Sequence, residues 1–379
     1  MVEARMHFDV AVAGGSIAGL CVGNALLNAG FDVQIFERSP GRLSSRGAGI
    51  VVQPELLGLL STINAPELAT TSCSIRRTLS GPSGNARTMS MPQRFTSWEA
   101  IYAALSAVFP KERYYEGVAL EIDHSVSSGV MARVGDRTIS ADVLIAADGF
   151  RSAARHRFAP ETTTKYAGYI AWRGVVDEAE LPSSLTSFFD DTFTFCNVAD
   201  GGHALCYFIP GDGLSTERGT RRLNWVWYVT IAEGATLDAL MTDRDGNRRD
   251  AAVPEGWVNE QALIDLRQAT NALDPRFAEL VNGTKQPFIQ SIVDVAPPAM
   301  VFGRVCLLGD AAFVVRPHTA AAAAKAAADS TALVRALRAS APDYDRGLAA
   351  WERQQMAVGN QLVDYGVRLG EGSRKFGVR

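Results

Sequence analysis

The chain has 379 residues, of which 47% are hydrophobic, and its formal net charge is −4. This length and composition allow a large buried core and about two domains, and they argue against a disordered protein. The weak charge, with both signs interspersed, does not suggest nucleic-acid binding, and no run of about 18 apolar residues could span a bilayer as a helix.

The cysteines indicate the compartment. There are five, an odd number, scattered mostly within apolar stretches, and no secretory pattern precedes Asp9. We therefore expect reduced, buried thiols in a cytoplasmic protein. Because the chain contains no CxxC motif and no paired His/Cys spacing, we predict no metal site.

The first motif in chain order is a glycine-rich turn. Residues 9–20 read DVAVAGGSIAGL. The apolar run before Gly14 predicts a buried parallel strand, and Gly14 and Gly15 allow the sharp turn that follows it. Gly19 lets the next helix pack closely on that strand. The helix would therefore present its free N–H groups to a phosphate.

A second apolar stretch, FDVQIF, completes a βαβ unit and ends at Glu37, where a ribose-binding carboxylate is expected. Ser16 stands where the usual motif has its middle glycine. By themselves, these residues fit either NAD or FAD. The polar loop of residues 38–49 contains Arg46, which could bind a phosphate or could be an ordinary solvated arginine.

Further along, residues 73–92 predict a hairpin that turns at GPSG, and ADVLIAADG predicts a buried strand ending at Asp148. Alternating, aromatic-rich segments between residues 166 and 230 predict an antiparallel sheet. RVCLLGDAA then predicts another buried strand, with Asp310 at its end, followed by an alanine-rich helix and a helical tail. That tail could pack on its own domain or on a partner, so a homodimer is one expectation.

Three motifs together resemble those of the single-component FAD-dependent aromatic hydroxylases. They are GGSIAG with Glu37, the Asp148-Gly149 strand end with Ser152 and Arg155, and LGDAA followed by Pro317. The resemblance spans nearly the whole chain. It implies an α/β fold in which a Rossmann-like FAD-binding domain carries an inserted antiparallel-sheet substrate domain, as in para-hydroxybenzoate hydroxylase. We assign residues 1–72, 93–165 and 286–379 to the FAD domain, and residues 73–92 and 166–285 to the substrate domain.

The same resemblance implies that NADH or NADPH reduces the bound FAD as a transient co-substrate. O₂ then forms a hydroperoxide at flavin C4a, whose terminal OH passes to a small electron-rich aromatic ring. On this basis we assign the cofactor contacts to Gly14, Gly15, Ser16, Ile17, Gly19, Glu37, Arg38, Arg46, Gly49, Arg94, Val118, Asp148, Gly149, Gly309, Asp310, Pro317, Ala320 and Ala321.

The chain departs from the family pattern near the flavin. Phe313 replaces a histidine, Thr319 and the alanines from Ala320 replace glycines, and Lys325 replaces an asparagine. We expect Lys325 either to reach the flavin edge or to be a cation on the helix surface. GGSIAGL, GAGIVVQPEL, RFTSWEAIY, YAGYIAWRGVV, LNWVWYV and RPHTAAAAAKAAAD are most similar to family members that hydroxylate dihydroxypyridines.

His318, directly after Pro317, is the first candidate for polarising or deprotonating a ring hydroxyl, and His203 and Tyr207 are the others. The predicted walls of the substrate site are aromatic and few arginines are expected among them, Arg173 being the main one in a structural or rim position. The predicted wall residues are Tyr169, Phe193, Phe195, Tyr207, Phe208 and Trp227. This favours a small neutral ring, such as a hydroxylated pyridine, over a benzoate.

Two other functions are open at this point. One is a urate- or salicylate-type hydroxylase on the same fold. The other is a flavoprotein that binds an aromatic ligand without turnover, which cannot be separated from an enzyme while the catalytic base is unidentified. A halogenase is disfavoured because LNWVWYV does not match the W-x-W-x-I-P pattern.

Overall fold

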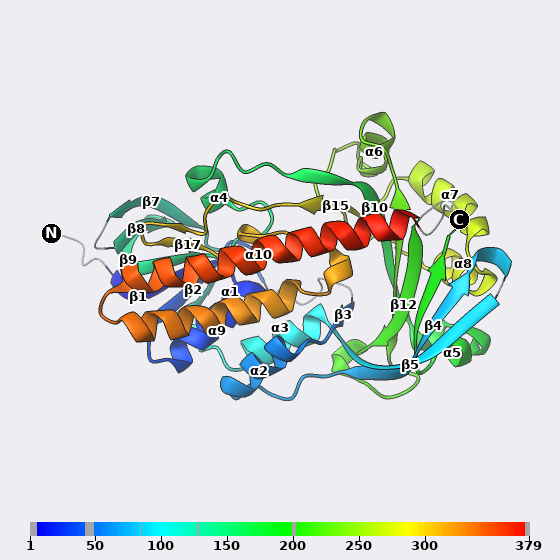
Figure 1. The fold of residues 1–379 in the computed structure, drawn as a ribbon, viewed down its shortest axis with the longest axis horizontal. Helices are drawn as coiled ribbons and strands as arrows, with labels where there is room; N and C mark the ends of the chain where they lie inside the picture. Colours follow the sequence, from blue (N-terminus) through cyan, green and yellow to red (C-terminus); the bar gives the residue numbers. More distant parts are fainter. Residues whose placement is uncertain (1–5, 42–48, 84, 127–128, 199–201, 376–379) are drawn as a thin grey trace.

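The computed structural model describes residues 6–41, 49–83, 85–126, 129–198 and 202–375. Within these residues the strands form one sheet of eight strands and one of nine. Figure 1 shows the first sheet near the N-terminus, the second at the opposite end, and the long helix α10 (Tyr344–Lys375) extending from one toward the other.

The first sheet is parallel at its centre, and its main strand order is β16-β17-β9-β1-β2-β6. Its strands are β1 (Met6–Ala13), β2 (Val33–Glu37), β6 (Tyr114–Glu116), β7 (Leu120–Val126), β8 (Gly129–Val134), β9 (Arg137–Ala146), β16 (Val301–Phe302) and β17 (Val305–Leu307). Helices α1 (Ile17–Asn28) and α9 (Ala322–Ser340) pack against each other beside this sheet, and α9 also packs on α10. Strand β1 is buried throughout Val10–Ala13, as its continuous apolar run predicts.

The register of the parallel strands brings the three motifs to one edge. Ala13 of β1 lies beside Ala146 of β9, and Ala146 lies beside Leu307 of β17. The glycine-rich turn, the Asp148-Gly149 turn and the Gly309-Asp310 turn therefore follow neighbouring strands at the same carboxyl end. This is the edge at which open α/β sheets bind their ligands.

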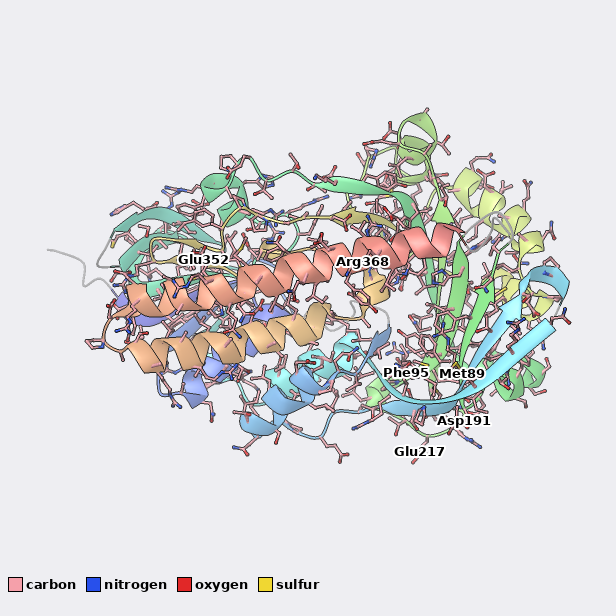
Figure 2. All side chains as sticks on the ribbon, in the orientation of Figure 1. Met89, Phe95, Asp191, Glu217, Glu352 and Arg368 are labelled. Atoms are coloured by element: carbon pink, nitrogen blue, oxygen red, sulfur yellow. The ribbon has the colours of Figure 1, made fainter. Side chains whose placement is uncertain are left out.

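The second sheet is mostly antiparallel, with the order β14-β15-β10-β13-β12-β11-β4-β5-β3. Its strands are β3 (Gly49–Val51), β4 (Thr71–Ser80), β5 (Asn85–Ser97), β10 (Lys165–Asp177), β11 (Thr192–Asn197), β12 (His203–Ile209), β13 (Arg222–Thr230), β14 (Ala252–Val253) and β15 (Phe288–Asp294). The predicted hairpin is confirmed as β4 and β5, which Figure 2 shows as a long pair carrying Met89 and Phe95.

The two faces of this sheet differ. One face contributes Trp172, Trp225 and Trp227 to a core with the helices α7 (Glu260–Ala269) and α8 (Pro275–Gly283), so their prediction as core residues is confirmed. Because side chains alternate along a strand, neighbours such as Arg173 and Tyr228 face the other way, toward a cavity. Phe208 also belongs to the core. The prediction that Phe208 and Trp227 line the substrate site is wrong, since both side chains lie on the core face.

The remaining helices are α2 (Pro54–Thr62), α3 (Trp98–Ser106), α4 (Ala153–Phe158), α5 (Ser183–Phe189) and α6 (Ala235–Leu240). The domain boundaries given above stay a prediction; β15, from the third segment of the proposed FAD domain, pairs with β10 in the second sheet. All five cysteines are free and buried. Among the described residues, no helix has both the length and the apolar character needed to cross a membrane.

Candidate active site

The glycine-rich turn has no room for side chains. Gly14 has a φ of +101°, and a Cβ there would lie 2.3 Å from the carbonyl oxygen of Ala147. A Cβ on Gly19 would lie 1.9 Å from the carbonyl oxygen of Gly14. Ser16 precedes Ile17, the first residue of α1, and its side chain does not cap that helix. The Ser16 hydroxyl therefore does not occupy the first N–H groups of α1, which have no partner within the helix.

Glu37 fixes this turn from the end of β2. Its carboxylate accepts hydrogen bonds from the N–H groups of Gly15 and Ser39, both at 2.8 Å, and the Val118 N–H donates to its backbone carbonyl at 2.9 Å. Tyr114, which no sequence motif indicated, also holds this turn, because its hydroxyl donates to the Gly15 carbonyl at 2.9 Å. The role of Glu37 toward a ribose stays a prediction.

At the end of β9, Asp148 begins the second turn. Its Oδ2 accepts a hydrogen bond from the Ala153 N–H at 2.8 Å, while its Oδ1 is buried and has no partner among the described residues. Gly149 follows with a φ of +81°. A buried carboxylate oxygen without a partner is costly, so this atom is a candidate acceptor for a ligand.

Arg155 joins the second turn to the third. Its guanidinium is buried and donates to the carbonyls of Asp310 and Ala311 at 3.0 and 2.8 Å. Asp310 faces the open cavity, but the protein around its carboxyl group is dense. Desolvation raises the pKa of Asp310, and the positive charges of Arg155 and Lys325 partly oppose this rise.

The segment after Pro317 forms a single 3₁₀ turn, Pro317–Thr319, before α9 begins. Ala320 lies in the left-handed region with a φ of +51°, a conformation that usually selects glycine. Lys325 is 5% exposed, and its Nζ forms an ion pair with Asp329 at 2.5 Å. The alternative that Lys325 is a surface cation is therefore wrong, because this face of α9 packs against Phe313.

A cavity of about 880 Å³ joins Asp310 and the segment around Pro317 to the open face of the second sheet. No residue of the glycine-rich turn or of the Asp148-Gly149 turn lines it. Of the predicted site residues, it is lined by Gly49, His203, Tyr207, Asp310, Pro317, His318, Ala320 and Ala321. Arg38 is exposed after β2, and Arg94 donates to the Thr70 hydroxyl, so neither lines this cavity. Arg46 lies outside the described residues.

The two candidate histidines meet in this cavity, with ring centres 5.4 Å apart. Burial lowers the pKa of His318 to about 3, with further lowering by His203 and Arg316, and burial with Arg76 lowers that of His203 to about 4. Both rings are therefore neutral near pH 7. His318 Nε2 lies 2.9 Å from the Tyr169 hydroxyl, a contact that the sequence did not reveal.

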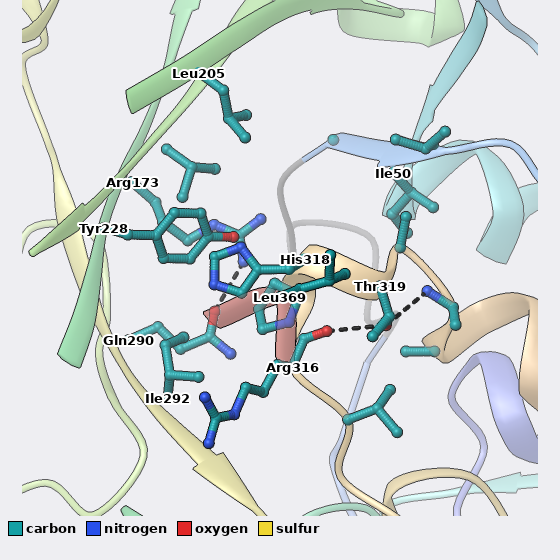
Figure 3. A pocket seen from close by; sticks show the side chains of 18 of the residues that line it. Ile50, Arg173, Leu205, Tyr228, Gln290, Ile292, Arg316, His318, Thr319 and Leu369 are labelled. Carbon is teal, nitrogen blue, oxygen red and sulfur yellow. Dashed lines mark hydrogen bonds between the residues drawn. The ribbon is translucent and has the colours of Figure 1, made fainter. Parts of the chain in front are cut away.

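Tyr207 stacks on Phe95 with ring centres 4.2 Å apart, and burial raises its pKa to about 12. Figure 3 shows the side chains of Arg173, Tyr228 and Gln290 beside His318. Arg173 lines the cavity and also donates to Gln290 at 2.8 Å, which is a structural contact of the kind expected. In the sequence, only the alternation of side chains along β10 indicated this placement. It shows that Arg173 faces away from Trp172, but the side facing the cavity is known only once Trp172 is known to be buried.

The site fits FAD on structural grounds. Gly14, Gly15 and Gly19 keep the turn at the start of α1 free of side chains, and Asp148 has an oxygen without a partner among the described residues. Asp310 lies at the cavity wall. A dinucleotide could lie along this edge with its pyrophosphate near the start of α1 and its ring system in the cavity. Among the described residues, no cluster of His, Cys, Asp and Glu could hold a metal ion.

Comparisons with known proteins agree with this geometry. Residues 166–294 match a family described as FAD binding domain-like. A 2,6-dihydroxypyridine 3-monooxygenase of Paenarthrobacter nicotinovorans is 36% identical over 358 residues, which cover 94% of this chain and 89% of that protein. A 6-hydroxynicotinate 3-monooxygenase of Pseudomonas fluorescens is 26% identical over 360 residues, which cover 90% of this chain and 86% of that protein.

Among solved structures, 2,6-dihydroxypyridine-3-hydroxylase from Arthrobacter nicotinovorans superposes with a TM-score of 0.91 at 34% identity, covering 99% of this chain and 95% of that one. A Klebsiella pneumoniae protein complexed with FAD and uric acid shares the fold, with a TM-score of 0.72 at 22% identity over 97% of this chain and 87% of its own. The predicted fold class and the FAD cofactor are thereby confirmed. The chain belongs to the family of FAD-dependent aromatic hydroxylases, and it is a flavoprotein monooxygenase with NAD(P)H as the reductant typical of that family.

Proposed function

We propose that this enzyme hydroxylates a small hydroxylated pyridine. The observation that carries the proposal is the shared cavity: Asp310 and Pro317 line it on the cofactor side, and Phe193, Tyr207 and Tyr228 line it on the side of the second sheet. A flavin ring at the first side would face a small aromatic ring at the second. Similarity to a dihydroxypyridine monooxygenase over 94% of the chain supports a pyridine ring as the substrate class.

Bound FAD, reduced by NAD(P)H, supplies the activation of O₂. The protein's own residues would provide the enclosed site. Phe95, Phe193 and Tyr207 form an aromatic cluster on the sheet face, which limits water near the reacting ring. The lowered pKa values make His318 and His203 weak bases, so their neutral rings suit hydrogen bonding to a ring oxygen or nitrogen better than proton abstraction.

His318 offers a direct prediction. His318→Gln should leave FAD content and melting temperature nearly unchanged, since the ring borders the cavity and its resolved hydrogen bond is the one to Tyr169. Losing its contact to the substrate should slow hydroxylation by about tenfold to a hundredfold, or divert reduced flavin to peroxide. The measurement is product formed per NAD(P)H oxidised, with FAD absorbance and thermal melting as controls. Wild-type coupling and rate in this variant would refute the role.

The test of the function is a steady-state comparison of 2,6-dihydroxypyridine with salicylate, 4-hydroxybenzoate and urate. We expect substrate-stimulated NAD(P)H oxidation, O₂ uptake and a hydroxylated product with the pyridine. A kcat/KM at least about tenfold higher for salicylate or urate would favour the urate- or salicylate-type alternative. Ligand binding without NAD(P)H oxidation would indicate a binding flavoprotein instead.

Several finer assignments also remain proposals. They are the cofactor contacts given above, the two-domain division, a cytoplasmic location and a homodimer. The choice between NADH and NADPH can be made by comparing the two reductants in the same assay. Light scattering of the FAD-loaded enzyme would measure its mass and so test the homodimer.

A further inference from the structure

Arg173 lines the cavity, and not all of its guanidinium N–H donors have a hydrogen-bond partner among the described residues. It lies on β10 between Val226 of β13 and Phe288 of β15, and its Nη1 donates to Gln290 Oε1 at 2.8 Å. Its Nε is buried and has no hydrogen-bond partner among the described residues. Figure 3 shows its side chain in the same part of the cavity as Tyr228 and His318.

Two of the three most buried arginines are paired with carboxylates, whereas the third, Arg155, donates to backbone carbonyls. Arg316 is paired with Asp294 at 2.6 Å, and Arg221 is paired with Glu178 at 2.6 Å. No carboxylate in the described part of the chain forms an ion pair with Arg173. A partly buried cation without a counter-charge is costly, which suggests that an anion completes the site.

The groups around Arg173 cannot provide that anion. Burial raises the pKa of Tyr207 to about 12 and raises that of Tyr228 further, although the charge of Arg173 opposes both rises. Both hydroxyls therefore stay protonated near pH 7. Gln290 and the nearby His318 are neutral as well. These neighbours supply no negative charge near pH 7, and no ion pair joins Arg173 to the cavity carboxylate Asp310, so a bound anion would balance the guanidinium.

We propose that Arg173 binds an ionised oxygen of the substrate, so that the ring is held as its anion beside His318. This inference rests on the proposed function and deepens it. A guanidinium would favour the ionised hydroxyl directly, because opposite charges at close range stabilise the ionised form. An ionised hydroxyl donates electron density to the ring and so makes its carbon atoms more nucleophilic. No protein base needs to remove the proton within the site.

The proposal replaces the expectation that the substrate is a neutral ring. That expectation assumed few arginines in the cavity, whereas four line it: Arg76, Arg173, Arg316 and Arg368. Arg316 is paired with Asp294. Arg76 differs from Arg173 because its guanidinium lies over the Phe195 ring, 4.2 Å from the ring centre. Arg368 is exposed, and Figure 2 shows where it lies on α10. Arg173 is therefore the arginine with a buried, unpaired donor.

The experiment compares two ligands of the same shape by calorimetry. FAD-loaded protein without NAD(P)H would be titrated at about pH 7.5 with 2,6-dihydroxypyridine and with resorcinol. The ring nitrogen makes the pyridine the stronger acid, so it binds as an anion, whereas resorcinol stays neutral like an ordinary phenol. The variants are Arg173→Gln, Arg173→Lys and, as a matched arginine in the same cavity, Arg76→Gln.

We expect Arg173→Gln to weaken binding of the pyridine by about tenfold to a hundredfold and binding of resorcinol by less than about threefold. Arg173→Lys should recover part of the pyridine affinity, because lysine restores the positive charge but not the paired N–H donors of the guanidinium. Arg76→Gln should preserve the wild-type difference in affinity between 2,6-dihydroxypyridine and resorcinol. FAD absorbance and thermal melting would show that each variant is folded and loaded.

Equal losses for both ligands in Arg173→Gln, or no loss, would overturn the assignment, as would loss of the preference in Arg76→Gln alone. The proposed function fails separately if the wild-type enzyme binds the pyridine but does not hydroxylate it. Failure of the wild-type enzyme to bind the pyridine at all would overturn both proposals.

Discussion

Asp310→Ala should release FAD from the protein. Asp310 follows β17 at the edge shared by the three turns, and its carboxyl group faces the cavity. Removing a charged acceptor of ligand hydroxyl groups should weaken FAD binding by at least about tenfold, since hydrogen bonds to charged groups contribute roughly 1.5–3 kcal/mol. The measurement is the FAD dissociation constant from flavin fluorescence, with purified colour as the first indication.

Asp310→Asn separates cofactor binding from folding. Because the pKa of Asp310 is raised in the folded protein, its ionised form destabilises the cofactor-free fold above the ordinary aspartate pKa of about 4. The cofactor-free Asn variant should therefore melt at or above the wild-type temperature near pH 7. This difference should shrink as the pH falls and vanish below about 4, where the wild-type carboxyl group becomes protonated in the unfolded state as well as in the folded one.

Wild-type FAD affinity in Asp310→Ala would contradict the cofactor assignment of this residue. A lower melting temperature for cofactor-free Asp310→Asn near pH 7 would contradict the electrostatic argument, because the carboxylate would then be stabilising the fold. The two outcomes are independent. One reports on the bound cofactor and the other on the protein alone.

Gly19→Ala should abolish FAD binding. The added Cβ would lie 1.9 Å from the carbonyl oxygen of Gly14, so α1 and the turn must move apart. Such a displacement moves the start of α1 away from the position where it can meet a pyrophosphate. We expect at least a hundredfold loss of FAD affinity, or about 3 kcal/mol, and lower thermal stability.

Gly58→Ala is the matched control. Gly58 lies inside α2, and an added Cβ there meets no atom within 4 Å. Because alanine favours a helix over glycine, this variant should bind FAD normally and gain up to about 1 kcal/mol of stability. Flavin fluorescence and thermal melting measure both variants. Normal FAD binding by Gly19→Ala would mean that the close packing of α1 on the turn is not needed for the cofactor.

The sequence determined the parts of the site that depend on local chemistry. A strand of consecutive apolar residues, a turn that tolerates only glycine, and an acidic residue at a strand end can each be read from a few neighbouring positions. Gly14, Asp148 and Asp310 were found in this way. The resemblance to a family then predicted a common role for them in FAD binding.

Only the tertiary structure decided which side chains share the cavity. Alternation along β10 places Trp172 and Arg173 on opposite faces, but the pattern does not say which face packs on helices and which borders the cavity. The contact of His318 with Tyr169 joins residues 149 positions apart. Lys325 became a buried cation because α9 packs in the interior, and an alanine-rich sequence carries no strong signal for its buried face. These features arise from long-range packing, which local propensity does not encode.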